Sequence, residues 1–133
     1  KEPIQGGTEQ ILIVDDEEPI ITMEKEMLEL LGYKITAFTS SLEAFEAFRA
    51  NPDKFDLIIT DMTMPFMPGD KLASELMKIR PDIPILLCTG FSKTMSKEKA
   101  ASLGIKDFLI KPIVMKDLTK KVRQVLDGNL SPT

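Results

Sequence analysis

Two short apolar runs end in acidic residues, and this pattern constrains the fold more than any other feature of the 133-residue chain. Ile11–Val14 precedes Asp15 and Asp16, and Leu57–Thr60 precedes Asp61. Runs of this length and composition are typical of buried strands. If the two strands are parallel neighbours, three carboxylates meet at one edge of the sheet. Their mutual repulsion then has to be relieved by a cation or a proton, which marks a functional site.

Strand and helix signals alternate along the whole chain. This alternation favours an α/β fold in which one parallel sheet carries helices on both faces. Right-handed crossovers favour the doubly wound, flavodoxin-like arrangement of five strands in the order 2-1-3-4-5, where strands one and three are neighbours. The predicted strands cover about residues 10–14, 34–38, 55–60, 85–88 and 107–110. The predicted helices cover about residues 19–31, 41–50, 70–79, 92–103 and 115–126.

Apolar residues at helical spacing predict which side of each helix faces the core. For the first helix the predicted inner stripe is Ile20, Met23, Met27, Leu30 and Leu31. For the second helix it is Leu42, Phe45 and Phe48.

The length of the chain suits one domain with a single core. We predict a linker or tail over residues 1–8, the domain over residues 9–128 and a C-terminal tail over residues 129–133. Because the sequence starts with Lys1 and not with methionine, we expect it to be a piece of a longer protein. No apolar run approaches the ~18 residues that a membrane-spanning helix needs.

The sequence contains no histidine and one cysteine, Cys88. Without histidine the chain cannot build a Ser-His-Asp triad, a Cys-His dyad or a His-ligated metal site. One cysteine cannot form an internal disulfide, which favours a reducing, cytoplasmic location for this domain. That expectation holds whether or not the parent protein is attached to a membrane.

The net charge of −4 is divided unevenly along the chain. Residues 1–91 carry 8 Lys/Arg and 17 Asp/Glu, a net charge of −9, whereas residues 92–133 carry 9 and 4, a net charge of +5. The C-terminal excess is explained either by solvated helix faces or by a basic docking face around Lys93, Lys97, Lys99 and Lys106. The acidic total gives little support to nucleic-acid binding.

Four motifs stand at the ends of the first, third, fourth and fifth predicted strands. They are Val14-Asp15-Asp16-Glu17, Asp61 with Pro65 and Gly69 downstream, Thr89-Gly90, and Lys111-Pro112. In this order the motifs resemble those of the receiver domain of two-component signalling, the phosphoacceptor module of response regulators and hybrid histidine kinases. The resemblance covers about residues 10–126, nearly the whole chain.

The resemblance implies that Asp61 accepts a phosphoryl group from a phosphohistidine on a histidine kinase or a histidine phosphotransfer domain. It implies that Asp15, Asp16, Asp61 and the backbone carbonyl of Thr63 bind Mg²⁺, for which Mn²⁺ can substitute. Oxygen ligands of this kind suit Mg²⁺. On its own the domain would be a self-phosphorylating acceptor with autodephosphorylation, and not an enzyme.

The resemblance also assigns residues that respond to phosphorylation. Thr89 would donate its hydroxyl to the phosphoryl group, and Lys111 would supply a mobile positive charge. Phe108 takes the place of an aromatic switch that turns inward, although a plain core phenylalanine is an alternative. The Lys111–Pro112 bond is a candidate cis peptide.

By the same resemblance, we expect one surface to contact a downstream signalling protein or a kinase core. This output face comprises residues 92–103, 107–110 and 115–126. No nucleic-acid or membrane contact is expected of this domain. The stretch Leu87–Ser92 resembles receivers that belong to hybrid sensor kinases.

Three other functions fit the sequence less well. A phosphate- or nucleotide-binding protein of flavodoxin shape needs hydroxyl or glycine-rich donors after the first strand, where this chain has four acidic residues, 15–18. A phosphatase of the haloacid dehalogenase type needs a second acid where Thr63 stands. A degenerate receiver that only contacts proteins would lack an acid, the threonine or the lysine, and all are present.

Overall fold

The computed structural model describes residues 5–90 and 96–128, which form one five-stranded parallel sheet in the order β2-β1-β3-β4-β5. The predicted doubly wound, flavodoxin-like fold is therefore confirmed. The strands are β1 (Gln10–Val14), β2 (Lys34–Phe38), β3 (Leu57–Asp61), β4 (Ile85–Thr89) and β5 (Asp107–Ile110). The helices are α1 (Glu18–Leu30), α2 (Ser41–Ala50), α3 (Gly69–Ile79), α4 (Lys97–Leu103) and α5 (Met115–Leu126).

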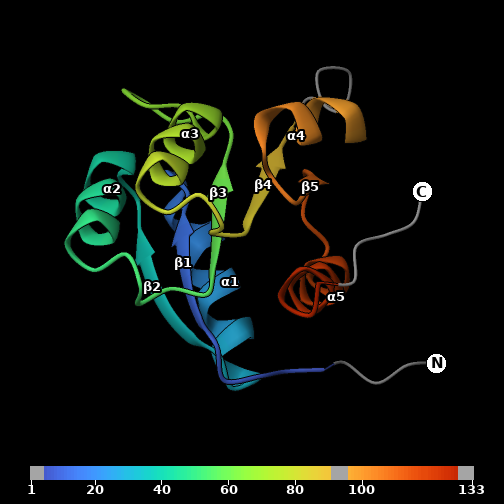
Figure 1. Ribbon diagram of the computed structural model, residues 1–133. Helices are drawn as coiled ribbons and strands as arrows, with labels where there is room; N and C mark the ends of the chain where they lie inside the picture. Colours follow the sequence, from blue (N-terminus) through green and yellow to red (C-terminus); the bar gives the residue numbers. More distant parts are fainter. Residues whose placement is uncertain (1–4, 91–95, 129–133) are drawn as a thin grey trace.

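The helices cover both faces of the sheet (Figure 1). On one face, α2, α3 and α4 pack through buried residues such as Phe48, Leu76 and Ala100. On the other face, α1 and α5 pack through residues such as Leu28 and Val122. Because both faces are covered, β3 and β4 are buried along their full length and β1 is buried from Ile11 to Val14, as the apolar runs predict.

The register of the strands brings the predicted motifs to one edge of the sheet. Val14 pairs with Thr60, so Asp15 and Asp61 follow side by side at the ends of β1 and β3. Asp61 in turn pairs with Cys88, which places Thr89 at the next strand end. All strands are parallel, so these carboxyl-terminal ends lie at the same edge, where ligand sites of this fold occur.

The predicted inner stripe of the first helix is wrong by one position. Leu30 is 83% exposed and Met23 is 45% exposed, whereas Ile21, Glu24 and Leu28 are buried. One residue along a helix corresponds to a rotation of about 100°. A stripe defined by hydrophobicity alone excludes Glu24, a carboxyl that packs inward with only 2% exposure.

The predicted face of the second helix also needs a correction. Leu42 is 49% exposed, and the small residue Ala44 is buried instead, together with Phe48. The hydroxyl of Ser40 caps α2 by accepting a hydrogen bond from the Glu43 amide, which fixes the start of the helix and hence its rotation. In the described part of the chain α4 starts at Lys97, and residues 92–95 of the predicted helix lie outside that part.

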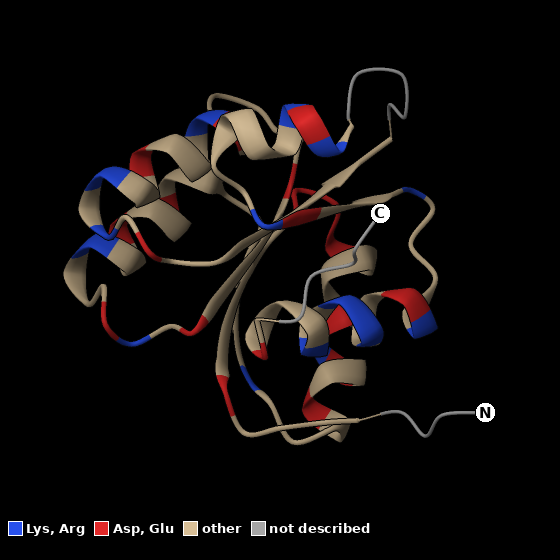
Figure 2. Cartoon of the chain, turned by 45° about the vertical axis from the view of Figure 1, so that its right-hand side comes forward, with Lys and Arg blue, Asp and Glu red and all other residues tan. Residues whose placement is uncertain are grey.

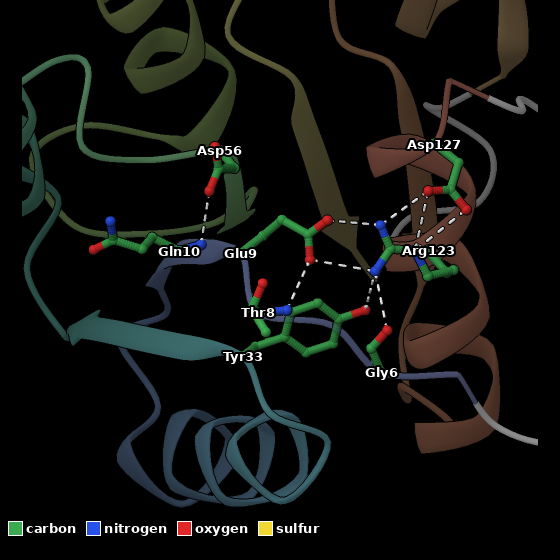
Figure 3. Close-up of polar contacts among 8 residues, drawn as sticks. All are labelled: Gly6, Thr8, Glu9, Gln10, Tyr33, Asp56, Arg123 and Asp127. Atoms are coloured by element: carbon green, nitrogen blue, oxygen red, sulfur yellow. Dashed lines mark hydrogen bonds and ion pairs between the residues drawn. The ribbon is translucent and has the colours of Figure 1, made fainter.

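The segment before β1 packs on the body of the domain at the amino end of that strand, where Gly6 and Glu9 lie beside Arg123 (Figure 3). The Gly7 amide donates to the Leu31 carbonyl over 3.1 Å, and a Cβ atom at Gly6 would lie 2.0 Å from the same oxygen. Arg123 of α5 donates to the Gly6 carbonyl and pairs with Glu9. Residues 6–9, which the sequence presents as linker and first domain residue, are thus held by α1 and α5.

None of the helices in the described residues is both long and apolar enough to cross a membrane. Acidic and basic residues are spread over helices on both sides of the sheet (Figure 2).

Candidate phosphorylation site

The site is built from three carboxylates that two neighbouring strands bring together. Asp15, Asp16 and Asp61 each offer an oxygen, and these oxygens lie within 4.8 Å of one another. Asp15 and Asp61 are 3% and 5% exposed, whereas Asp16 is exposed. The sequence predicted this cluster from the ends of the apolar runs, and the register of β1 and β3 produces it.

Lys111 brings the opposite charge to the cluster from the end of β5. Its Nζ lies 2.8 Å from Asp61 Oδ1 and 3.5 Å from Asp15 Oδ2. The Lys111 amide donates to the Thr89 carbonyl over 2.8 Å, and the Lys111–Pro112 bond is cis. The backbone of this loop is therefore fixed against β4, and the long lysine side chain reaches across the strand ends to the acids.

The electrostatics of the site show the cost of crowding the acids. Burial raises the pKa of Asp15, and repulsion from Asp61 adds to that effect. Burial also raises the pKa of Asp61, against the opposing hydrogen bond from Lys111. Burial acts to lower the pKa of Lys111, but the surrounding carboxylates outweigh it and the pKa is raised. One ammonium thus relieves the repulsion only in part, and a bound cation would relieve the rest.

The loop after Asp61 is shaped by a glycine that approaches the strand closely. A Cβ atom at Gly69 would lie 2.0 Å from the Asp61 carbonyl oxygen, and the Gly69 amide donates to the Met62 carbonyl over 2.7 Å. Within this loop Thr63 is exposed, and Phe66 is 94% exposed with a φ of 68°. Gly69 therefore closes a tight loop that holds Asp61 at the mouth of the site.

The predicted switch residues Thr89 and Phe108 lie on β4 and β5, the two strands that follow β3 in the sheet. Thr89 is fully buried at the end of β4. Phe108, on β5, is partly buried and packs against the core on the α2–α4 side. It also lines a surface pocket of about 430 Å³ between α4 and β5, together with Lys97 and Lys106. Lys93, which the sequence groups with these lysines, lies outside the described residues.

Two carboxylates near the site have no role in the sequence-based prediction, although Glu17 belongs to one of its motifs. Glu17 Oε1 lies 3.5 Å from Lys111 Nζ, so Glu17 joins Asp15 and Asp61 as a third acid in contact with the ammonium. Glu24 lies inside α1, where burial and then repulsion from Asp15 raise its pKa to about 7. A helical stripe shifted by one residue, through Ile21, Glu24 and Leu28, would have revealed Glu24 in the sequence.

Comparison with known proteins agrees with this geometry. A family model described as the response regulator receiver domain matches residues 11–123. The chain therefore belongs to the response regulator receiver domain family of two-component systems, and Asp15, Asp16 and Asp61 fit the phosphorylation site of that family.

Individual relatives agree in both sequence and structure. A probable transcriptional regulator, ycf27, of Cyanidium caldarium is 34% identical over 116 residues, which are 87% of this chain and 45% of that protein. A receiver domain protein from Clostridium thermocellum is 30% identical, with a TM-score of 0.83 over 90% of this chain and 95% of that one. The chain spans less than half the length of the curated relatives that it matches.

A receiver domain that was solved with magnesium shares the fold of this chain. It belongs to the sensor histidine kinase PA1611 of Pseudomonas aeruginosa and has a magnesium ion coordinated in its active site cleft. It is 23% identical, with a TM-score of 0.79 over 91% of this chain and 99% of that one, a likeness that concerns the fold alone.

Proposed function

We propose that this domain accepts a phosphoryl group on Asp61 from a phosphohistidine of a partner protein. The observation that carries the proposal is the cluster of three carboxylates, with oxygens within 4.8 Å of one another, of which Asp15 and Asp61 also pair with the ammonium of Lys111. Phosphoryl transfer needs a positioned nucleophile and positive charge for the phosphoryl oxygens, and little other chemistry from the protein. The absence of histidine means that the donor imidazole belongs to another domain or chain.

The residues take distinct parts in this transfer. An oxygen of the Asp61 carboxylate attacks phosphorus, the P–N bond of the donor breaks, and its electron pair stays on the imidazole nitrogen. Lys111, 2.8 Å from Asp61 Oδ1, keeps the carboxylate ionised and then pairs with a phosphoryl oxygen. Thr89 donates its hydroxyl to another oxygen. The domain acts as the acceptor of one group and is not a turnover enzyme by itself.

The donor set also fits Mg²⁺, which the receiver family implies. Asp15, Asp16 and Asp61 offer only oxygen ligands, and the exposure of Asp16 leaves room for the waters that Mg²⁺ retains. We place the backbone carbonyl of Thr63 in the same ligand set. The ion supplies positive charge for the carboxylates and the phosphoryl oxygens. Mn²⁺ prefers similar oxygen ligands and should substitute.

The proposal is tested by incubating the domain with Mg²⁺ and acetyl phosphate and weighing the intact protein by mass spectrometry. We expect a mass gain of one phosphoryl group that hydroxylamine removes, because hydroxylamine cleaves acyl phosphates. Asp61→Ala should abolish the gain, whereas the control Asp53→Asn, at an exposed position, should keep it. A gain that survives in Asp61→Ala would contradict the acceptor role.

We further propose that phosphorylation changes the α4–β5–α5 face, where the downstream partner docks. Phe108 links the two regions, since it lies on β5 opposite Leu87 of β4, two residues before Thr89, and lines the pocket beside α4. Lys97 and Lys106 line the same pocket, and Lys93 and Lys99 add to the basic charge of this part of the sequence. We therefore infer a partner with an acidic contact surface.

Charge reversal tests this docking proposal. Lys106→Glu should weaken binding of the phosphorylated domain to its partner about 5- to 50-fold and reduce the dependence of binding on salt. The matched control is Lys34→Glu. Lys34 is exposed and lies on β2, the edge strand opposite to β5. Equal effects of the two variants would exclude this face as the docking site.

We propose a cytoplasmic hybrid sensor kinase as the parent protein, on the strength of the stretch Leu87–Ser92 and the single cysteine. The donor would then be a histidine kinase core or a histidine phosphotransfer domain. The reading frame around this segment tests the proposal, because a hybrid kinase would encode a kinase core in the same chain.

A further inference from the structure

Glu17 stands at the mouth of the phosphorylation site, and the acceptor chemistry above gives it no role. Its Oε1 lies 3.5 Å from Lys111 Nζ, the same distance as Asp15 Oδ2. Its side chain is 59% exposed, whereas the side chains of Asp15 and Asp61 are 4% and 5% exposed. Glu17 is thus the outermost carboxylate in contact with the ammonium.

The backbone holds Glu17 in this place. The Glu17 amide donates to Asp15 Oδ1 over 2.9 Å, and the Glu17 carbonyl accepts hydrogen bonds from the amides of Ile20 and Ile21 in the first turn of α1. The residue is therefore anchored between the end of β1 and the start of α1. Its side chain extends from this fixed backbone to Lys111 and remains in contact with solvent.

A count of charges shows what Glu17 changes. Asp15, Asp16, Asp61 and Glu17 bring four negative charges, and Lys111 brings one positive charge. With one divalent cation bound, the site keeps one negative charge. Without Glu17 the same loaded site would be neutral. Glu17 therefore decides whether an approaching anion meets a neutral or a repelling site.

We propose that Glu17 is a specificity-determining residue that disfavours small dianionic phosphodonors. The inference rests on the proposed acceptor function of Asp61. A small dianion must approach the phosphoryl-binding position past Glu17, with few other contacts to offset the repulsion. A protein donor binds over a wide surface, so one rim charge changes a smaller share of its affinity.

The test compares two small donors that differ in charge. Acetyl phosphate is a dianion at neutral pH and phosphoramidate is a monoanion, and both transfer the same group. We expect Glu17→Gln to raise the second-order rate constant for acetyl phosphate about fivefold, as for one unit charge a few ångströms away in a largely aqueous setting. The rate constant for phosphoramidate should rise by only about twofold, because half the donor charge gives half the interaction energy. Glu17→Lys should exceed Glu17→Gln with acetyl phosphate.

Glu18→Gln is the matched control. Glu18 is the adjacent exposed acid at the first position of α1, and in the described residues it has no ion pair with Lys111. Both acids favour the helix N-terminus, so an effect through the helix dipole alone would appear in both variants. Each variant is assayed at saturating Mg²⁺, fixed by titration, and the Glu17→Gln effect should shrink at high ionic strength.

The outcomes separate the inference from the proposed function. If the unaltered domain gains no phosphoryl group from either donor, the acceptor function of Asp61 fails. If the domain is phosphorylated but Glu17→Gln leaves both rates unchanged, changes both equally or matches Glu18→Gln, only the role of Glu17 is overturned. A selective increase for acetyl phosphate supports it.

Discussion

The two ends of the sheet carry clusters of charged residues that differ in how fully opposite charges are paired. At the amino ends of the strands, Arg123 binds Glu9, the Tyr33 hydroxyl, the Gly6 carbonyl and Asp127, so nearly every polar group in the cluster has a partner (Figure 3). At the carboxyl ends, one ammonium, that of Lys111, pairs with three carboxylates, and Asp16 adds a fourth negative charge beside them.

The difference appears in the titration of the acids. Hydrogen bonding to Arg123 lowers the pKa of Glu9, whereas burial raises the pKa of both Asp15 and Asp61. The native fold thus gains stability from ionised Glu9 and loses some from ionised Asp15 and Asp61. A cluster that stabilises the fold thus pairs each charge with an opposite one. A cluster suited to bind a cation and transfer phosphoryl groups keeps an excess of negative charge.

The largest expected effect comes from breaking the paired cluster. Arg123→Ala should lower the free energy of unfolding by about 2–4 kcal/mol, because it leaves Glu9 and the buried Tyr33 hydroxyl without this donor. Urea denaturation in the absence of divalent cations measures the change. Lys25→Ala, which removes an exposed pair with Glu29, should cost less than about 0.5 kcal/mol. Similar losses in the two variants would refute the special role of the Arg123 cluster.

The second prediction concerns the buried acid behind the site. The pKa of Glu24 is raised to about 7 from a usual value of 4.5. The folded state therefore binds the Glu24 proton more tightly, so stability is lost as pH rises from about 4.5 to about 7. Glu24→Gln should then be more stable than the unaltered domain by roughly 1–3 kcal/mol at pH ~8, and about equally stable near pH ~4.5.

Urea denaturation across this pH range measures the Glu24 effect. Glu26→Gln, at an exposed position on the same helix, should leave the pH profile unchanged. A Glu24→Gln difference that is the same at both ends of the pH range would show that packing, and not charge, sets the effect.

The smallest expected effect is the change in stability caused by Asp15→Asn, and its sign depends on whether Mg²⁺ is present. In EDTA, Asp15→Asn should raise the free energy of unfolding by about 0.5–1 kcal/mol, because it removes a buried charge that Asp61 repels. With about 10 mM Mg²⁺ the unaltered domain should be the more stable one, since only its full ligand set gains from binding the ion. Thermal unfolding under both conditions provides the measurement, and the same sign in both would argue against a metal role for Asp15.

Much of the site could be predicted because strand ends are local features. The runs before Asp15 and Asp61 are apolar and short, and parallel strands bring their carboxyl ends to one edge. The position of Lys111 after β5 follows from the same reasoning. These predictions require only that each residue lies at or next to the end of its strand, so errors of one residue in the strand boundaries do no harm.

The helices were less predictable because burial depends on rotation. Leu30 and Leu42 are apolar but exposed, while Glu24 is acidic but buried. A one-residue error moves a side chain by about 100° around the helix axis, and hydrophobicity alone does not fix the rotation. Residues 6–8 gave no sign of their contacts with α1 and α5, since the partners Leu31 and Arg123 are distant in sequence.

The sequence by itself determined the order of strands and helices, the α/β class and the three acids that meet at one edge, because these follow from local composition and from the handedness of the crossovers. Only the tertiary structure decided that Glu17 shares Lys111, that Glu24 faces inward and that Arg123 holds Glu9. Those contacts depend on helix rotation and on side chains that meet across long sequence separations, where the alternatives differ by packing energies that no local pattern encodes.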